Sequence, residues 1–242
     1  MAFCYGQYSK VRTLVKIQVI DISAACAKLL HMGEDEFRIV RVEKKRATVV
    51  LHLQNGSSVS LLWSVYQRHA AGLATTRISR RSLQDLIAEN TFQQGYDAAC
   101  RYLARRARTA EEVRRYLANK QFDRETVASV LQALEQKGYL NDMELARSMI
   151  AQWKKRLKGP RYMAYQLTGK GVAREQASEL VRALYTRQEE ADILRGLATQ
   201  KAAAWADMDP RKRRQKLYRF LTGRGFTQSM IMDALADCCG DG

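Results

Sequence analysis

The residues VRRYLANKQFDRETVASVLQAL (113–134) predict two helices joined by a short turn. Val113 and Leu117 lie four positions apart, which places both on one face of the first helix. Asp123 is well placed to cap the second helix, and the apolar residues up to Leu134 follow a helical period. A helix–turn–helix of this kind is common, so its meaning depends on whether it recurs.

The pattern recurs twice. MAYQLTGKGVAREQASELVRAL (163–184) and LYRFLTGRGFTQSMIMDALADC (217–238) align with it without gaps. Val113, Met163 and Leu217 coincide, so the period is 50 and then 54 residues, at or just beyond the usual range for helical repeats. Another predicted helix precedes each pair, so the sequence predicts tandem three-helix units. Units of this size bury little alone and must pack on their neighbours.

Upstream of the repeats, apolar and polar residues alternate as in β-strands. RATVVLHLQNGSSVSLLW (46–63) contains Asn55–Gly56, a strong signal for a tight hairpin. One helix is expected after Ser79, and a separate one from Tyr96 opens the first repeat. We therefore expect a mainly α chain, in which an elongated array of three-helix repeats follows a small mixed α/β domain. The expected bounds are 1–95 for the N-terminal domain, and 96–141, 142–188 and 189–242 for the repeats.

Charge is the unusual property of the composition, with 41 Lys+Arg against 25 Asp+Glu and a net charge of +16. Such an excess favours a polyanionic partner, most often nucleic acid, or an acidic surface. Basic residues gather where the first and second helices of each repeat meet, and such clusters in line could follow a phosphate backbone or an acidic groove. Helix C-termini ordinarily carry some of this charge. The predicted filament- or DNA-binding residues are Arg105, Arg106, Arg108, Arg114, Arg115, Lys154, Lys155, Arg156, Lys158, Arg161, Arg211, Lys212, Arg213 and Arg214.

Aromatic residues are interleaved with these clusters, and two interpretations stay open. Their rings could stack on nucleobases, as in proteins that bind single strands. They could instead pack between units, as rings at helical spacing more often do. The residues concerned are Tyr102, Tyr116, Tyr162, Tyr165, Tyr218 and Phe220.

The sequence offers no catalytic constellation. Gly169, Gly171, Gly223 and Gly225 match one another as turn residues and form no phosphate-binding loop. The five cysteines and three histidines show no metal-ligand spacing. We therefore expect no enzymatic activity, no metal and no cofactor. Charges interrupt residues 14–30, which predict neither a signal peptide nor a membrane span. We therefore expect a cytoplasmic protein. We also expect it to be a monomer.

Several motifs together resemble the RecX family, bacterial regulators of the RecA recombinase. They are RYLARRARTAEEVRRYLANKQFD (101–123), QKGYLND (136–142), KGPRYMAYQLTGKGV (158–172) and RKRRQKLYRFLTGRGF (211–226). The resemblance runs from about residue 96 to 237 and extends less closely to 46–90. It implies a curved array of three-helix repeats that binds along the helical groove of the RecA–DNA filament. It also implies that the protein limits filament extension, ATP hydrolysis and strand exchange in homologous recombination, DNA repair and the SOS response.

On this resemblance the basic residues would meet the filament or DNA, single- or double-stranded. Linked repeats would bridge successive protomers through many weak contacts, without chemistry of their own. The alternative is a general single- or double-stranded DNA-binding protein without recombinase specificity. The two differ in their response to salt, because a protein that binds only DNA loses affinity steeply as the salt concentration rises.

Overall fold

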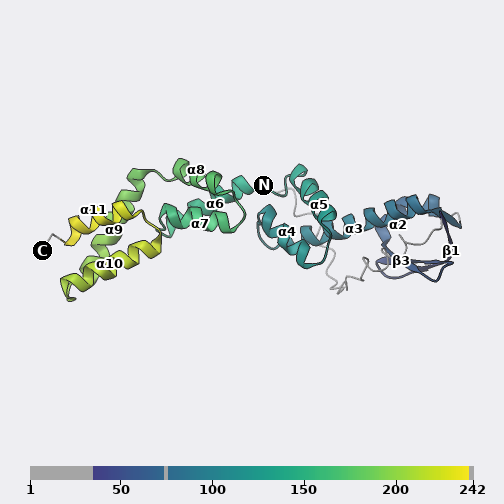
Figure 1. Cartoon of the computed structure of the whole chain (residues 1–242), viewed down its shortest axis with the longest axis horizontal. Helices are drawn as coiled ribbons and strands as arrows, with labels where there is room; N and C mark the ends of the chain where they lie inside the picture. Colours follow the sequence, from purple (N-terminus) through teal and green to yellow (C-terminus); the bar gives the residue numbers. More distant parts are fainter. Residues whose placement is uncertain (1–34, 74–75, 240–242) are drawn as a thin grey trace. The chain divides into compact units, whose positions relative to one another are not determined.

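The computed structural model describes residues 35–73 and 76–239 (Figure 1). The stretch at 14–30, and what was expected of it, lies outside these residues. The chain divides into two compact units, residues 1–94 and 95–242. Within the described ranges, no helix is both long and apolar enough to cross a membrane.

The described part of the first unit is built on an antiparallel sheet with strand order β3-β2-β1-β4. The predicted hairpin is confirmed, because β2 and β3 pair across a turn in which Gly56 has a φ angle of 80°. The Asn55 side chain supports this turn by accepting a hydrogen bond from the Ser57 N–H at 3.0 Å. The strands are β1 (Glu36–Lys44), β2 (Thr48–Leu53), β3 (Ser58–Leu62) and β4 (Arg77–Ser79).

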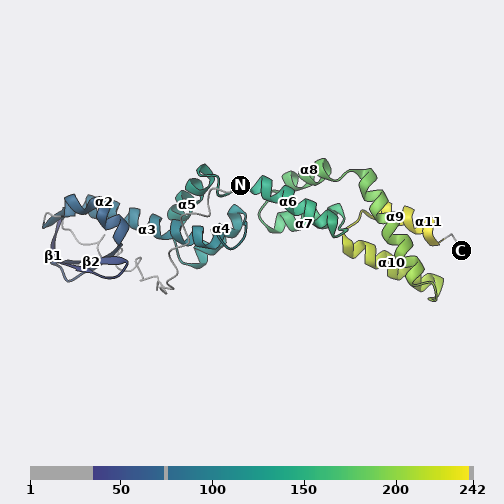
Figure 2. The same ribbon diagram turned by 180° about the vertical axis from the view of Figure 1, so that it is seen from behind.

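Two helices, α2 (Trp63–Leu73) and α3 (Arg80–Leu103), pack against one face of this sheet (Figure 2). Alternate strand residues point to that face. Phe37 of β1 and Leu61 of β3 are therefore buried in one core with Leu83 of α3. This core belongs to the first unit alone and gives it a fold of its own.

The helix α3 is continuous, whereas the sequence predicted two separate helices. Ser79 does open it, because its hydroxyl accepts a hydrogen bond from the Ser82 N–H at 3.1 Å. The helix then runs through Gly95, since glycine weakens a helix without ending it. A Cβ on Gly95 would lie 3.3 Å from the Val130 side chain, so the glycine lets α5 approach closely. The expected break at 95/96 is therefore absent from the helix.

The second unit contains the predicted tandem three-helix repeats, which confirms the fold class. The predicted cap at Asp123 forms, Thr109 and Glu112 form a capping box at the start of α4, and Asn141 caps α6. Repeat 1 is the end of α3 with α4 (Ala110–Asn119) and α5 (Arg124–Gln136). Repeat 2 is α6 (Asp142–Lys155), α7 (Pro160–Gly169) and α8 (Arg174–Leu184). Repeat 3 is α9 (Arg187–Ala204), α10 (Pro210–Arg224) and α11 (Gln228–Cys239).

Repeats 2 and 3 each enclose a small core made by one apolar face of every helix. In repeat 2, Ile150 of α6 packs with Met163 of α7 and Val181 of α8. In repeat 3, Leu194 of α9 and Leu217 of α10 pack with residues of α11, and α10 and α11 lie along α9 (Figure 1). Ile193 of α9 packs against both cores, and the helix ends supply further contacts between these repeats.

Repeats 2 and 3 are joined where the C-terminal end of α10 meets the N-terminal end of α7. The Gly159 N–H donates to the Arg224 carbonyl at 2.9 Å, and the Arg161 N–H donates to the Gly225 carbonyl at 3.0 Å. These bonds satisfy amide and carbonyl groups that helix ends leave without partners. They also bring the positive end of one helix dipole against the negative end of another.

Repeats 1 and 2 are joined in the same way. The hydroxyl of Thr109, the N-cap of α4, donates to the carbonyl of Lys170, the C-cap of α7, at 2.7 Å. Gly171 and Gly225 occupy equivalent turns with φ angles of 94° and 85°. A Cβ on Gly171 would collide with Glu111 of the preceding repeat, and one on Gly225 with Tyr162. Only glycine combines the left-handed backbone with so close an approach.

We expect Gly225→Ala to destabilise the protein more than Gly138→Ala. Gly138 also has a positive φ, of 71°, but a Cβ there would meet nothing within 4 Å. Gly138→Ala should therefore cost only the backbone term, about 1–2 kcal/mol. Gly225→Ala adds a collision with Tyr162 and should cost about 1–3 kcal/mol more. Urea unfolding followed by circular dichroism measures both, and equal losses would contradict the close helix-end contact.

Candidate binding surface

The structure divides the predicted binding residues into two groups. The side chains of one group interact within the protein: Arg106, Arg108, Arg114, Arg115, Lys154, Lys158, Arg213 and Arg214. The other group is exposed, and its side chains make no ion pair, hydrogen bond or ring contact within residues 35–73 and 76–239. These are Arg105, Lys155, Arg156, Arg161, Arg211 and Lys212.

Glu112 pairs with several cations at the junction of repeats 1 and 2. Its Oε1 atom lies 3.0 Å from Arg106 Nη2, 3.7 Å from Arg108 Nη1 and 3.2 Å from Lys170 Nζ. Its Oε2 atom accepts the Thr109 N–H at 3.1 Å. Because Lys170 belongs to repeat 2, this carboxylate holds two repeats together as well as capping α4.

The pKa of Glu112 reflects two opposing effects. Burial alone would raise it, since the side chain is only 17% exposed. The hydrogen bond from Thr109 and the charges of Lys170 and Arg106 outweigh burial, and the pKa lies below its ordinary value. The carboxylate therefore stabilises the fold above its unfolded pKa, and this stabilisation is lost as the pH falls through the folded pKa.

Other predicted binding residues are also held by the fold. Arg114 and Arg115 both pair with Glu111 on the same helix. The Lys154 ammonium lies 2.8 Å from Glu189 Oε1 and also donates to the last carbonyl of α8 at 3.0 Å. It thereby ties α6 to the end of α8 and the start of α9. The basic surface open to a partner is smaller than the sequence suggested.

The second helix of repeat 3 differs from those of repeats 1 and 2. The first buried residue of α4 is Val113 and that of α7 is Met163, each in the first turn of its helix. The helix α10 begins at Pro210, but its first buried residue is Leu217. It therefore has one more helical turn before its apolar stripe, which accounts for the lengthening of the period from 50 to 54 residues.

This extra turn carries the third basic cluster, Arg211–Arg214. The helix α10, PRKRRQKLYRFLTGR, contains no acidic residue, whereas α4, α6 and α9 each have acids in the first turn. Cations at a helix N-terminus face the positive end of its dipole, which disfavours them. Asp209 caps the helix by accepting the Lys212 N–H at 3.1 Å. The exposed cations of this turn favour an anionic partner.

Of the interleaved aromatic side chains, only Tyr165 is free of the packing. The rings of Tyr102 and Tyr116 lie parallel with centroids 4.1 Å apart. Tyr165 is 76% exposed, and its side chain makes no hydrogen bond and no ring interaction with the described residues. The other packed rings are Tyr162, Tyr218 and Phe220.

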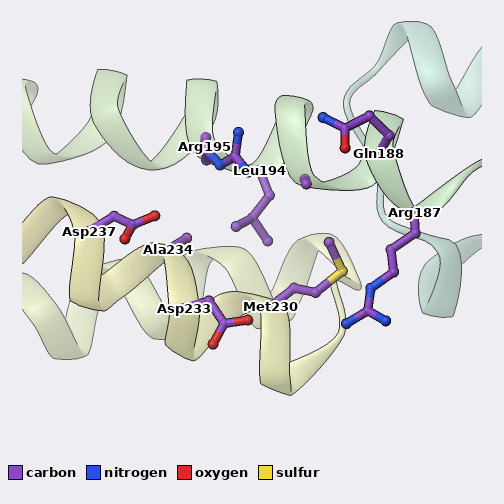
Figure 3. Close-up of a pocket in the computed structure, with 9 residues that line it drawn as sticks. Arg187, Gln188, Leu194, Arg195, Met230, Asp233, Ala234 and Asp237 are labelled. Carbon is purple, nitrogen blue, oxygen red and sulfur yellow. The ribbon is translucent and has the colours of Figure 1, made fainter.

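A groove of about 310 Å³ lies between α9 and α11 (Figure 3). Arg187 and Arg195 of α9 face Asp233 and Asp237 of α11, with Leu194 between them. Its opposite charges do not extend the basic surface. Nowhere in the described residues do histidine, cysteine, aspartate and glutamate side chains gather into a group that could hold a metal ion.

Sequence reasoning left Arg219 of α10 out of the binding set and could not separate Tyr165 from the other rings. Alignment of the repeats places both residues at the position of Arg115, and all of them are exposed. The equivalence was visible in the sequence, but the exposure of the ring was not. The run of four cations in a helix without acids, at the start of α10, was also visible in the sequence.

We expect Glu112→Gln to lower the free energy of unfolding at pH 7 by about 1 kcal/mol, because it removes the charge shared by Lys170 and Arg106. The difference from the wild type should shrink as the pH falls through the depressed pKa of Glu112. Urea unfolding at pH 7 and pH 3 measures this change. Glu111→Gln is the matched control, since its partners lie on the same helix, and an equal loss in both variants would contradict a contribution from the junction.

Two family models match the repeats. The model described as RecX, first three-helix domain, matches residues 96–134. The model described as RecX, third three-helix domain, matches residues 188–235. These ranges correspond to repeats 1 and 3 of the structure.

Curated relatives bear the name Regulatory protein RecX. That of Lactococcus lactis subsp. cremoris (strain SK11) is 26% identical over 161 residues, which are 65% of this chain and 60% of the relative. That of Leuconostoc citreum (strain KM20) is 27% identical over 202 residues, 81% of this chain and 74% of the relative. The chain thus spans about 60% of the Lactococcus protein's length.

Solved structures share the fold. A crystal structure of regulatory protein RecX has a TM-score of 0.61 at 19% identity and covers 83% of this chain and 99% of its own. RecX from Lactobacillus salivarius has a TM-score of 0.56 at 23% identity and covers 62% of this chain and 97% of its own. With the domain models at both ends of the repeat series and the named relatives along it, the repeats of this chain are similar to those of the RecX family.

Proposed function

We propose that this protein is a non-catalytic regulator of the RecA recombinase, acting as an inhibitor. It binds along the helical groove of the RecA–DNA filament and limits filament extension, ATP hydrolysis and strand exchange. The match of RecX domain models to repeats 1 and 3 carries the proposal. The name of the curated relatives, Regulatory protein RecX, points to the same role.

The distribution of free charge supports this mode of binding. Exposed cations that the fold does not use occur in all three repeats, at Arg105, at Lys155 and Arg156, and at Arg211 and Lys212. Each repeat can make a weak contact with an anionic surface, and linkage of the repeats adds these contacts through a high effective concentration. A protein bound in this way bridges neighbouring protomers and needs no reaction of its own.

The alternative is general DNA binding without recombinase specificity. The same free cations would serve it, because they can pair with any phosphate backbone. Competition separates the two roles, since excess duplex DNA removes a general DNA binder but leaves a protein that prefers the filament. A test of the proposed function therefore needs competitor duplex throughout.

We expect this protein to suppress single-stranded-DNA-dependent ATP hydrolysis by a preformed RecA filament at well below one copy per recombinase monomer, with competitor duplex present. Replacement of Lys155, Arg156, Arg211 and Lys212 by Gln should raise the concentration needed for half suppression by at least about tenfold, since each lost contact is worth a few tenths to 1 kcal/mol. Steady-state ATP hydrolysis measures both effects.

The matched control replaces four other exposed arginines by Gln and so removes the same net charge. They lie on α5, α6 and α8: Arg124, Arg147, Arg174 and Arg182. This control should suppress hydrolysis as the wild type does. No suppression by the wild type, or suppression abolished by competitor duplex, would contradict the proposed role. Equal effects of the two substitution sets would show that only net charge matters.

A further inference from the structure

Tyr165 lies on α7 and is the most exposed large hydrophobic side chain of the described residues, at 76%. The neighbouring positions leave its ring uncovered. Gly169 follows one turn later, and a Cβ there would meet nothing within 4 Å. The hydroxyl of Thr168 donates to the Ala164 carbonyl at 3.0 Å and so stays close to the helix backbone. The ring is therefore held out into solvent on a regular helix.

An exposed cation precedes this ring on the same helix. Arg161 precedes Tyr165 by one helical turn on α7 and is exposed, without a side-chain partner in the described parts of the chain. The equivalents of Tyr165 in the neighbouring repeats are Arg115 and Arg219, both exposed. The helix α7, PRYMAYQLTG, has no acidic residue to neutralise this charge.

We propose that Tyr165 is a stacking platform for a base of single-stranded nucleic acid, with Arg161 binding an adjacent phosphate. An exposed aromatic ring one helical turn from an unpaired cation is an arrangement suited to single strands, because every base offers a π-face and every nucleotide a negative charge. Duplex DNA offers phosphates but keeps its bases stacked inside, so it could use Arg161 and not the ring. An acidic protein surface would likewise use the charge without needing the ring.

This inference is independent of the proposed action on RecA, since it concerns DNA alone. If the wild type fails to bind a free single strand, the stacking inference is wrong while the RecA-directed proposal stands. If the wild type binds single strands but leaves RecA filaments active, the reverse holds. The experiment below therefore contains no recombinase.

The test is the affinity of the full chain for a fluorescein-labelled oligothymidylate, measured by fluorescence anisotropy. Tyr165→Ala should weaken binding about tenfold, the order expected for one stacked base. Tyr165→Trp should keep the affinity because it keeps an aromatic face. Affinity for a labelled duplex of equal length should change less than twofold in either variant. Thermal unfolding by circular dichroism verifies that each variant is folded.

Tyr139→Ala is the matched control, since Tyr139 is also exposed, at 47%, but lies between α5 and α6. It should bind the single strand as the wild type does. Arg161→Gln should lower the slope of log affinity against log salt concentration by about 0.7, the value for one phosphate contact on a single strand. This salt measurement tests the phosphate contact separately from the ring.

Two results would overturn the inference. One is unchanged single-strand affinity in Tyr165→Ala. The other is an equal loss on single strand and duplex, which would make the ring part of a general DNA contact.

Discussion

The contacts between helix ends determine how the repeats of this protein pack. Each repeat has a small core, so the join between repeats rests in part on the N-terminal amides and C-terminal carbonyls of the second helices. Burying these groups without hydrogen-bond partners is costly, and the carbonyls at one helix end accept hydrogen bonds from donors at the other. The Gly159 N–H donates to the Arg224 carbonyl and the Thr109 hydroxyl to the Lys170 carbonyl, so different donors join equivalent helix ends. Contacts between helix ends therefore join repeat 1 to repeat 2 and repeat 2 to repeat 3.

The same constraint determines which charges the protein can offer to a partner. Basic residues near the junctions are drawn into them, as Arg106 and Lys170 are by Glu112. Residues one or two positions away, such as Arg105 and Lys155, remain exposed. In repeat 3 the exposed cations lie on the extra turn of α10, and this helix has no acidic residue to pair with them. The net charge of the protein is +16, but the basic side chains that a partner can reach are unevenly distributed along the chain.

Local chemistry could be predicted from the sequence, and contacts between repeats could not. The hairpin at Asn55–Gly56 and the cap of α5 at Asp123 depend on neighbours within a few positions, and both form as expected. The continuity of α3 was missed because helical patterns on both sides of Gly95 do not show whether the chain bends between them. The free and paired cations could not be separated, because the partner of Glu112 in repeat 2 is 58 positions away. The exposure of Tyr165 could not be predicted either, because it depends on which residues pack around the ring in the folded protein.

The turn of repeat 1 has a further consequence. Gln121 adopts the left-handed backbone, with a φ angle of 65°, but carries a side chain where the later repeats have Gly171 and Gly225. A duplicated repeat 2 would carry a glycine turn at one end and, at Gly159, a helix start that already packs against such a turn, so it could be accommodated inside the series. A unit placed before repeat 1 would collide with Gln121, and one placed after repeat 3 would meet the extra turn of α10. Gene duplication could thus lengthen this protein from within but not from either end of its repeats.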